Sequence, residues 1–213
     1  GTGTIDNVFF NDISYPGYNG IAVVAFGNLK VQNSQFTDIG RVGIIFFGTG
    51  CSNGQAIGNT YTGKGVGDQL DYAIEVGGGA IASVSDCIIS NNKGIASTDG
   101  STSAGIIATT YYGAGTTANI TGCTLTDNTT GINVGYDNTD VSVVVANNNK
   151  IYSNREYGIF STGPAVDGTN NWWGDASGPY NDPYNTCGLG NAVVGLVDFM
   201  PWWTTESGGS SPE

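Results

Sequence analysis

The chain has 213 residues, with six Lys and Arg against 18 Asp and Glu, so that its net charge is −12. Six scattered cations cannot form the clustered basic surface that nucleic acid or an anionic membrane needs, which argues against both partners. The lack of histidine excludes Ser-His-Asp and Cys-His catalysis and His-ligated metals. No apolar run approaches the roughly 18 to 20 residues of a membrane span. With 35 Gly and only 11% charged residues, the composition favours an all-β protein of short strands and turns.

One motif recurs along the chain: an apolar residue, any residue, Asn, Asp or Gly, a small residue, any residue, and a second apolar residue. Its copies, the last of them degenerate, begin at Ile5, Val31, Ala56, Val84, Ile120, Ala146 and Thr169. A Gly-Ile or Ala-Ile pair opens another apolar run after each of the first six copies, with Ile at positions 21, 44, 74, 106, 132 and 159. An additional pair, Gly94-Ile95, precedes the longest insertion.

A period near 25 residues that holds three short strands and three turns is typical of one coil of a parallel β-solenoid. The third motif position lies at a sharp bend, where Gly, Asn and Asp tolerate the left-handed backbone. We expect the bend residues of successive coils to stack and their Asn side chains to hydrogen-bond from coil to coil: Asn7, Asn33, Gly58, Asp86, Gly122, Asn148 and Asn171. A second short ladder is expected at the following turn, from Asn92, Asn128 and Asn154. The alternative, a β-sandwich, does not explain seven copies with the bend in one place.

This repeat resembles the right-handed parallel β-helix repeat of the pectate-lyase-like superfamily. The segments 170–180 and 190–202, which read NNWWGDASGPY and GNAVVGLVDFMPW, are similar to the closing segment of such repeats in large secreted bacterial and archaeal surface proteins. The resemblance implies a single right-handed parallel β-helix of about seven coils at residues 1–203, located outside the cell or on its surface. It implies no particular activity, because the superfamily includes lyases, hydrolases and non-catalytic modules.

Residues 170–203 are expected to cover the last coil, whose apolar end and unpaired strand edges would otherwise be open. Four tryptophans supply the cover: Trp172, Trp173, Trp202 and Trp203. Residues 204–213 are interpreted as a flexible tail or linker. No comparable cover is evident at the N-terminal end, where Phe9, Phe10 and Tyr15 belong to the first coil.

Two residues are weak candidates for catalysis. Asn138-Thr139-Asp140 is similar to the Asn-Thr-Asp tripeptide of polygalacturonases, but the other motifs of that family are missing, and a lone carboxylate lacks the partner that inverting hydrolysis needs. Asp140 is therefore expected to cap a turn. Arg155, considered because pectate lyases use an arginine base, adjoins its own expected partner Glu156.

Aspartates could hold Ca²⁺ at two places. Asp12 and Asp38 fill the same motif position in adjacent copies, so that stacking would bring two carboxylates about 4.8 Å apart. A cation such as Ca²⁺ would relieve their repulsion. Asp68 and Asp71, in one loop, form a second candidate site. The alternative in each case is a solvated turn aspartate that caps local N–H groups.

Cysteines and tyrosines complete the candidates. Cys87 and Cys123 occupy the same inward motif position, so that their Cα atoms should lie about 5 Å apart. We expect stacked free thiols in the core, with a disulfide between the two as the alternative. The sequons at Asn119 and Asn128 are of the kind that arises by chance in a chain rich in Asn and Thr. Tyrosines in turns and insertions would suit either sugar stacking or a polar protein contact: Tyr15, Tyr18, Tyr111, Tyr112, Tyr136, Tyr180 and Tyr184.

Two classes of function remain. The first is a non-catalytic extracellular module, structural or adhesive, which either assembles head-to-tail with copies of itself into a filament or surface layer or belongs to a longer surface protein. The second is a carbohydrate-active enzyme or sugar-binding module whose partner is a polysaccharide. A cluster of carboxylates with a basic residue on one face of the coils would favour the second class.

Overall fold

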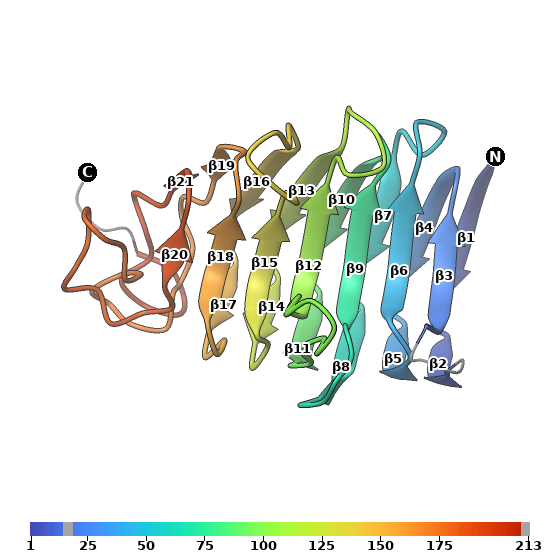
Figure 1. Cartoon of the computed structure of the whole chain (residues 1–213), viewed down its shortest axis with the longest axis horizontal. Helices are drawn as coiled ribbons and strands as arrows, with labels where there is room; N and C mark the ends of the chain where they lie inside the picture. The colour runs from blue at the N-terminus through green and yellow to red at the C-terminus, as the bar shows by residue number, and fades with distance from the viewer. Residues whose placement is uncertain (15–18, 210–213) are drawn as a thin grey trace.

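The computed structural model describes residues 1–14 and 19–209, and within these ranges the chain forms β-strands and no helix. The strands lie in three sheets, and every pairing between them is parallel (Figure 1). Consecutive strands along the chain pass from one sheet to the next, so that each sheet gains one strand per repeat. The predicted all-β class with stacked parallel strands is confirmed, and the arrangement is consistent with a β-solenoid.

The bounds of the strands follow the repeats closely. The eight-stranded sheet contains β1 (Thr2–Asp6), β4 (Asn28–Gln32), β7 (Gly54–Ile57), β10 (Ile81–Ser85), β13 (Thr117–Thr121), β16 (Val143–Asn147), β19 (Val166–Asp167) and β21 (Val197–Asp198). The six-stranded sheet contains β2 (Phe9–Ile13), β5 (Gln35–Ile39), β8 (Thr60–Gly65), β11 (Ile88–Asn92), β14 (Thr124–Thr126) and β17 (Lys150–Tyr152). The seven-stranded sheet contains β3 (Ile21–Ala25), β6 (Val42–Phe47), β9 (Tyr72–Gly77), β12 (Ala104–Thr109), β15 (Thr130–Val134), β18 (Tyr157–Ser161) and β20 (Val193–Val194).

The two apolar positions of the motif line the core in register. The first position stacks across the eight-stranded sheet through Ile5, Val31, Ala56, Val84, Ile120 and Ala146. The last position stacks across the six-stranded sheet through Phe10, Phe36, Tyr61, Ile89, Leu125 and Ile151. From Val31 and Phe36 onward these side chains are buried. Complete burial of one large aliphatic side chain contributes roughly 1.5–3 kcal/mol to the free energy of folding. Because the two positions recur in every repeat, their stacked side chains supply much of the stabilising core.

The Gly-Ile pairs supply the third wall of the core, with one difference. Ile44, Ile74, Ile106, Ile132 and Ile159 stack in the seven-stranded sheet and are buried. In the first repeat, however, Val23 pairs with Ile44, whereas Ile21 pairs with Val42 and is exposed. The Gly20-Ile21 pair is therefore two residues out of register with the later pairs, because β3 begins at Ile21 itself. Gly94-Ile95 lies in an insertion, where Ile95 bridges Thr102.

The backbone bends are left-handed where the motif predicts them in the first six copies. The positive φ angles lie at Asn7 (56°), Asn33 (50°), Gly58 (61°), Asp86 (55°), Gly122 (66°) and Asn148 (59°). In the seventh copy the bend falls on Asn170 (57°) instead of Asn171, which is buried. A parallel series of bends contains Asp12, Asp38, Asn91, Asp127 and Ser153.

The first hydrogen-bonded ladder lies one residue beyond the bends. Asn7, Asn33 and Asn148 are exposed, and Asn33 donates from its side chain to Asp6 Oδ1 of the preceding repeat at 2.9 Å. The continuous ladder is formed instead by buried residues that follow the later bends. There, Asn149 Oδ1 accepts a 2.9 Å bond from the Cys123 N–H, and Asn171 Oδ1 accepts a 2.8 Å bond from the Asn149 N–H. An interior N–H needs a partner from the protein, whereas an exposed side chain at a bend does not.

The second ladder connects Asn92, Asn128 and Asn154. Asn128 Oδ1 accepts bonds from the N–H (3.1 Å) and the side chain (2.7 Å) of Asn92. Asn154 Oδ1 accepts bonds of 3.0 Å from the same two groups of Asn128. Asn191 continues the row by accepting from Asn154 at 2.9 and 3.0 Å. This ladder buries Asn128, whereas the other sequon residue, Asn119, is exposed on β13.

Cysteines take the place of asparagine in two adjacent repeats of the first ladder. Cys87 and Cys123 are buried, free thiols, and they precede the paired residues Ile88 and Thr124. Each thiol donates to backbone carbonyls of the core, at 3.3 Å to Ser85 from Cys87 and at 3.4 Å to Thr121 from Cys123.

Residues 170–203 close the C-terminal end. Trp173 is completely buried, and a Cβ added to Gly158 would lie 3.0 Å from its ring. Trp202 packs against the same core from the outside, Trp172 bridges Lys150, and the Trp203 N–H donates to the Asn171 carbonyl at 2.9 Å. In the expected tail, Glu206 forms a 3.1 Å ion pair with Lys150, while residues 210–213 lie outside the described ranges. No helix long and apolar enough to cross a membrane occurs in the described part of the chain.

Candidate functional site

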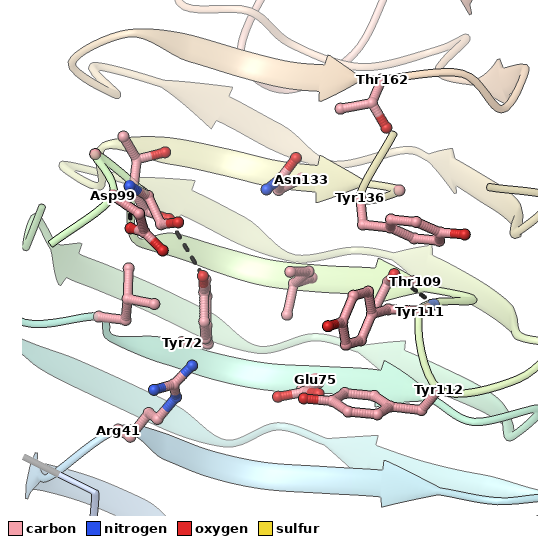
Figure 2. Close-up of a pocket in the computed structure, with 16 residues that line it drawn as sticks. Arg41, Tyr72, Glu75, Asp99, Thr109, Tyr111, Tyr112, Asn133, Tyr136 and Thr162 are labelled. Carbon is pink, nitrogen blue, oxygen red and sulfur yellow. Dashed lines mark hydrogen bonds between the residues drawn. The ribbon is translucent and has the colours of Figure 1, made fainter. Parts of the chain in front are cut away.

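A groove of about 550 Å³ crosses the outer face of the seven-stranded sheet. One side is formed by Arg41, Leu70 and the insertion between β11 and β12, residues 93–103. The other side is formed by the loops after β12 and β15, which carry Tyr111, Tyr112 and Tyr136 (Figure 2). The longest insertion predicted from the repeat spacing thus becomes one wall of a groove.

The floor of the groove carries Glu75 and Asn133, which face outward on β9 and β15. In the sheet, Ile45 and Ile107 flank Glu75, and Ile107 separates it from Asn133. Burial beside these apolar neighbours raises the pKa of the Glu75 carboxyl, and the positive charge of Arg41 opposes the shift. Within the described ranges, neither the Glu75 carboxylate nor the Arg41 guanidinium has a hydrogen bond or an ion pair. Asn133 Oδ1 is buried and also lacks a partner there.

The tyrosine wall is exposed and its rings touch. Tyr111 contacts Tyr112 with 4.9 Å between ring centroids and Tyr136 with 5.2 Å, both edge-to-face. Tyr111 is 63% exposed and Tyr112 is 59% exposed, so that ring surface remains open to a ligand. Such wide exposure of three touching aromatic rings is typical of a recognition surface, since single exposed aromatics are common but contiguous ones are not.

Asp140 holds the tyrosine wall together. Its carboxylate accepts bonds from the Thr109 hydroxyl (2.9 Å), the Thr110 N–H (2.8 Å), and the hydroxyl and N–H of Ser142 (2.6 and 2.8 Å). Burial raises the pKa of Asp140, but these hydrogen bonds outweigh it and keep the pKa below the usual value. The carboxylate is therefore an ionised acceptor with its lone pairs occupied, as the turn-capping interpretation predicts.

The opposite wall is anchored by short-range polar contacts. Asp68 accepts bonds of 2.6 Å from both the N–H and the hydroxyl of Ser97. Tyr72 donates to the Thr102 carbonyl at 3.3 Å, and Asp99 accepts from the Ser101 N–H at 2.9 Å. The bonds of Asp68 and Tyr72 fasten the 93–103 insertion to the loop before β9 and to β9 itself, whereas the Asp99 bond lies within the insertion. Asp99 also lines the groove (Figure 2).

The aspartates considered for Ca²⁺ do not gather around one point. Asp71 is buried, accepts from the Tyr61 hydroxyl at 2.6 Å and lies 3.6 Å from Lys64 Nζ. Burial raises the pKa of Asp71, with Lys64 opposing the shift, while burial lowers the pKa of Lys64. Asp12 and Asp38 sit at exposed bends of adjacent repeats. Over residues 1–14 and 19–209, no group of three or more Cys, Asp or Glu side chains could hold a metal ion.

The two weak catalytic candidates lie apart. Asp140 follows the end of β15, whereas Arg155 precedes the start of the neighbouring parallel strand β18, so the two residues lie beyond opposite ends of these strands. Arg155 lies 3.7 Å from Glu156, its expected partner. Tyr180 and Tyr184 belong to the closing segment and do not line the groove, while Tyr15 and Tyr18 lie outside the described residues.

Arg41, Glu75, Asp99 and Asn133 are groove residues that the sequence patterns did not single out. Only Glu75 carried a usable signal, as the one charged residue in the apolar strand 72–77. The groove combines open aromatic rings with unengaged hydrogen-bonding groups, an arrangement chemically suited to a ligand with both apolar faces and hydroxyl groups. Comparison with known proteins adds no assignment: no protein-family model, curated protein or solved structure matches this chain significantly.

Proposed function

We propose that this chain is a carbohydrate-binding module that holds a polysaccharide in the groove of the seven-stranded sheet. The observation that carries the proposal is the meeting of three open tyrosine rings with unengaged polar groups of Arg41 and Glu75 in one groove. Aromatic rings stack on the apolar faces of pyranoses, while amide, guanidinium and carboxylate groups bond to sugar hydroxyls. The carboxylates of Glu75 and Asp99, with Arg41 as the basic residue in the same groove, support the carbohydrate class.

The charge of the groove favours a neutral polysaccharide. Glu75 and Asp99 face a single cation, Arg41, and the whole chain carries −12. A polyuronide would be repelled by this field, because like charges in a partly enclosed groove are poorly screened. Binding without turnover is proposed, since the carboxylate that resembles a catalytic one, Asp140, is fully engaged in hydrogen bonds.

We further propose that the three sheets wind as a right-handed parallel β-helix of about seven coils, in a protein exported to the cell surface or beyond. Crossovers between parallel strands are right-handed in nearly all proteins, which supports the hand. The resemblance of the repeat and the closing segment to those of secreted surface proteins supports the location. The module would then serve adhesion, attached to other domains or to the surface itself.

Binding is tested by isothermal titration with neutral cello-, manno- and xylo-oligosaccharides and with oligogalacturonides as the charged comparison. Tyr111→Ala should weaken binding of a neutral oligosaccharide at least about tenfold, because stacking area is lost. Tyr184→Ala, an exposed tyrosine of the closing segment, is the matched control and should bind normally. Tighter binding of oligogalacturonides, or equal affinity of Tyr111→Ala and the parent, would overturn the proposal.

A second candidate is head-to-tail assembly with copies of this chain, which exposed apolar side chains of the first repeat favour. Val8 and Phe9 are both exposed there. Neighbouring exposed apolar side chains suit a contact with another copy, and a head-to-tail contact that does not close propagates as a filament. Light scattering and negative-stain microscopy should then show concentration-dependent filaments. A monomer at every concentration, with or without Ca²⁺, would contradict this candidate.

A further inference from the structure

The tyrosine wall continues beyond the groove as a row of five aromatic rings. Tyr112 contacts Phe47 with 5.4 Å between ring centroids, and Phe47 contacts Phe26 with 5.9 Å. Together with the Tyr112, Tyr111 and Tyr136 contacts, this makes one uninterrupted series, here called the aromatic row: Phe26, Phe47, Tyr112, Tyr111 and Tyr136. Phe26 and Phe47 do not line the groove itself.

The aromatic row runs along the long axis of the molecule. Its members lie at or just after the ends of β3, β6, β12 and β15. In the seven-stranded sheet these strands are neighbours in the order β15, β12, β9, β6, β3, with β9 between the two pairs. In Figure 1 these strands stand side by side across the horizontal long axis. A ligand that touches several members must therefore cross the strands and extend along the axis.

Glycines at the end of β9 allow the row to pass over that strand. Gly77 is the register partner of both Phe47 and Thr109, so that no side chain stands between the two phenylalanines and the tyrosines. A Cβ on Gly78 would approach the Phe47 ring at 3.0 Å. The small residues thus let Tyr112 reach Phe47 across a whole strand.

Phe26 is the far end of the row, and core packing does not account for it. Its side chain is 68% exposed, and it borders a shallow hollow of about 320 Å³ lined by residues 1–3 and 24–29. An isolated exposed phenylalanine needs no explanation, but one that continues a row of open rings from a polar groove does. No charged side chain lines this hollow.

We infer that the ligand is a linear neutral polysaccharide that lies along the solenoid axis, with Phe26 and Phe47 forming an outer subsite that selects long chains over short ones. This rests on the proposed function, because the groove must hold the sugars nearest to Tyr111. Continuity of the row with the groove favours one occupant. A chain whose units each offer a flat apolar face suits repeated rings, and the hollow beside Phe26, which no charged side chain lines, suits an uncharged polymer.

The inference is tested by titrating the protein with disaccharides and hexasaccharides of the cello, manno and xylo series. Phe26→Ala should lower the affinity for the hexasaccharide about three- to tenfold and leave the disaccharide affinity unchanged. Phe9→Ala removes a phenylalanine of similar exposure from the six-stranded sheet and should change neither affinity. Circular dichroism and the unfolding temperature establish that each variant is folded.

The outcomes separate the two proposals. If Tyr111→Ala weakens both ligands while Phe26→Ala affects neither, the outer subsite is wrong and the groove stands. If Phe26→Ala weakens both ligands equally, Phe26 acts through the groove and again forms no outer subsite. If no oligosaccharide binds, or a folded Tyr111→Ala binds like the parent, the proposed function fails and the inference fails with it.

Discussion

The carboxylate of Asp140 accepts a 2.8 Å hydrogen bond from the backbone N–H of Thr110, a residue 30 positions earlier. The two residues belong to the loops after β15 and β12, which carry Tyr136 on one side and Tyr111 and Tyr112 on the other. The aspartate that resembles a hydrolytic residue in sequence therefore acts in the structure as a fastener between two parts of the tyrosine wall.

Asp140→Asn should destabilise the protein by about 1–3 kcal/mol, because an amide cannot accept all the bonds that the carboxylate accepts. The unfolding temperature should fall by roughly 2–4 °C per kcal/mol in a chain of this size. Hydrogen bonds outweigh burial and keep the pKa of Asp140 in the folded protein below 3.8, its value in the unfolded chain. The carboxylate therefore contributes its full stabilisation above pH 3.8, and this stabilisation is lost as the pH falls through the pKa of the folded state. Calorimetry from pH 2 to 7 should show the parent and variant converging in acid; a constant difference would contradict this role.

Glu75→Gln should stabilise the free protein at neutral pH. Burial raises the pKa of Glu75 above 4.5, so the ionised carboxylate costs stability at pH 7, and protonation relieves that cost as the pH falls. The gain in unfolding temperature should therefore disappear below pH 4.5, where Glu75 of the parent is protonated in both the folded and the unfolded state. A variant that is less stable than the parent at pH 7 would show that Glu75 has a structural partner.

Leu125→Asp should prevent folding, because it places an unpaired carboxylate in the core at a cost of several kcal/mol. Thr124→Asp is the matched control: it changes the neighbouring residue of β14, which faces outward. Circular dichroism should show β structure for the Thr124 variant alone. If Leu125→Asp melts within a few degrees of the parent, the in-register core is wrong.

Asn128→Ala should cost at least about 2 kcal/mol, because it removes the acceptor of the Asn92 N–H inside the protein. The Asn92 side chain loses its partner in the same step. Asn119→Ala, an exposed asparagine on β13, should be nearly neutral. Urea unfolding of both variants measures the difference, and equal midpoints would exclude a role for the ladder in stability.

The fold was predictable because two separate features of the repeat determine how successive strands align. Alternation along each strand sets which side chains face inward, and the bend residue sets where each strand stops. Asn149 shows what the motif did not predict: the buried ladder lies one residue beyond the bend, because the interior N–H of Cys123 needs a polar partner. Asn171, which was expected in the ladder, does belong to it, and in that copy the bend lies at Asn170. The prediction that Ile21 lies level with Ile44 is wrong, because the Gly-Ile pair alone does not show at which residue the strand begins.

The groove was predictable only in part. Its tyrosines stand out as aromatic residues in turns, but Arg41, Glu75 and Asp99 come from three different repeats and from positions that the motif leaves free. They meet because the 93–103 insertion folds back over the sheet, and no periodicity in the sequence describes the path of an insertion. Outward-facing residues must be examined repeat by repeat before such a site becomes visible.

Both buried ladders can form only in the order in which the repeats are synthesised. In each one, the interior N–H of a repeat is satisfied by a side chain from the repeat that follows it along the chain, as with Asn92 and Asn128 or Cys123 and Asn149. Both rows end on residues 171 and 191, in the closing segment. A chain that emerges from the ribosome N-terminus first therefore always carries unmet donors at its newest end. Both ladders are complete only once the closing segment has been synthesised, so a chain that stopped before residue 171 would keep unsatisfied donors in its interior.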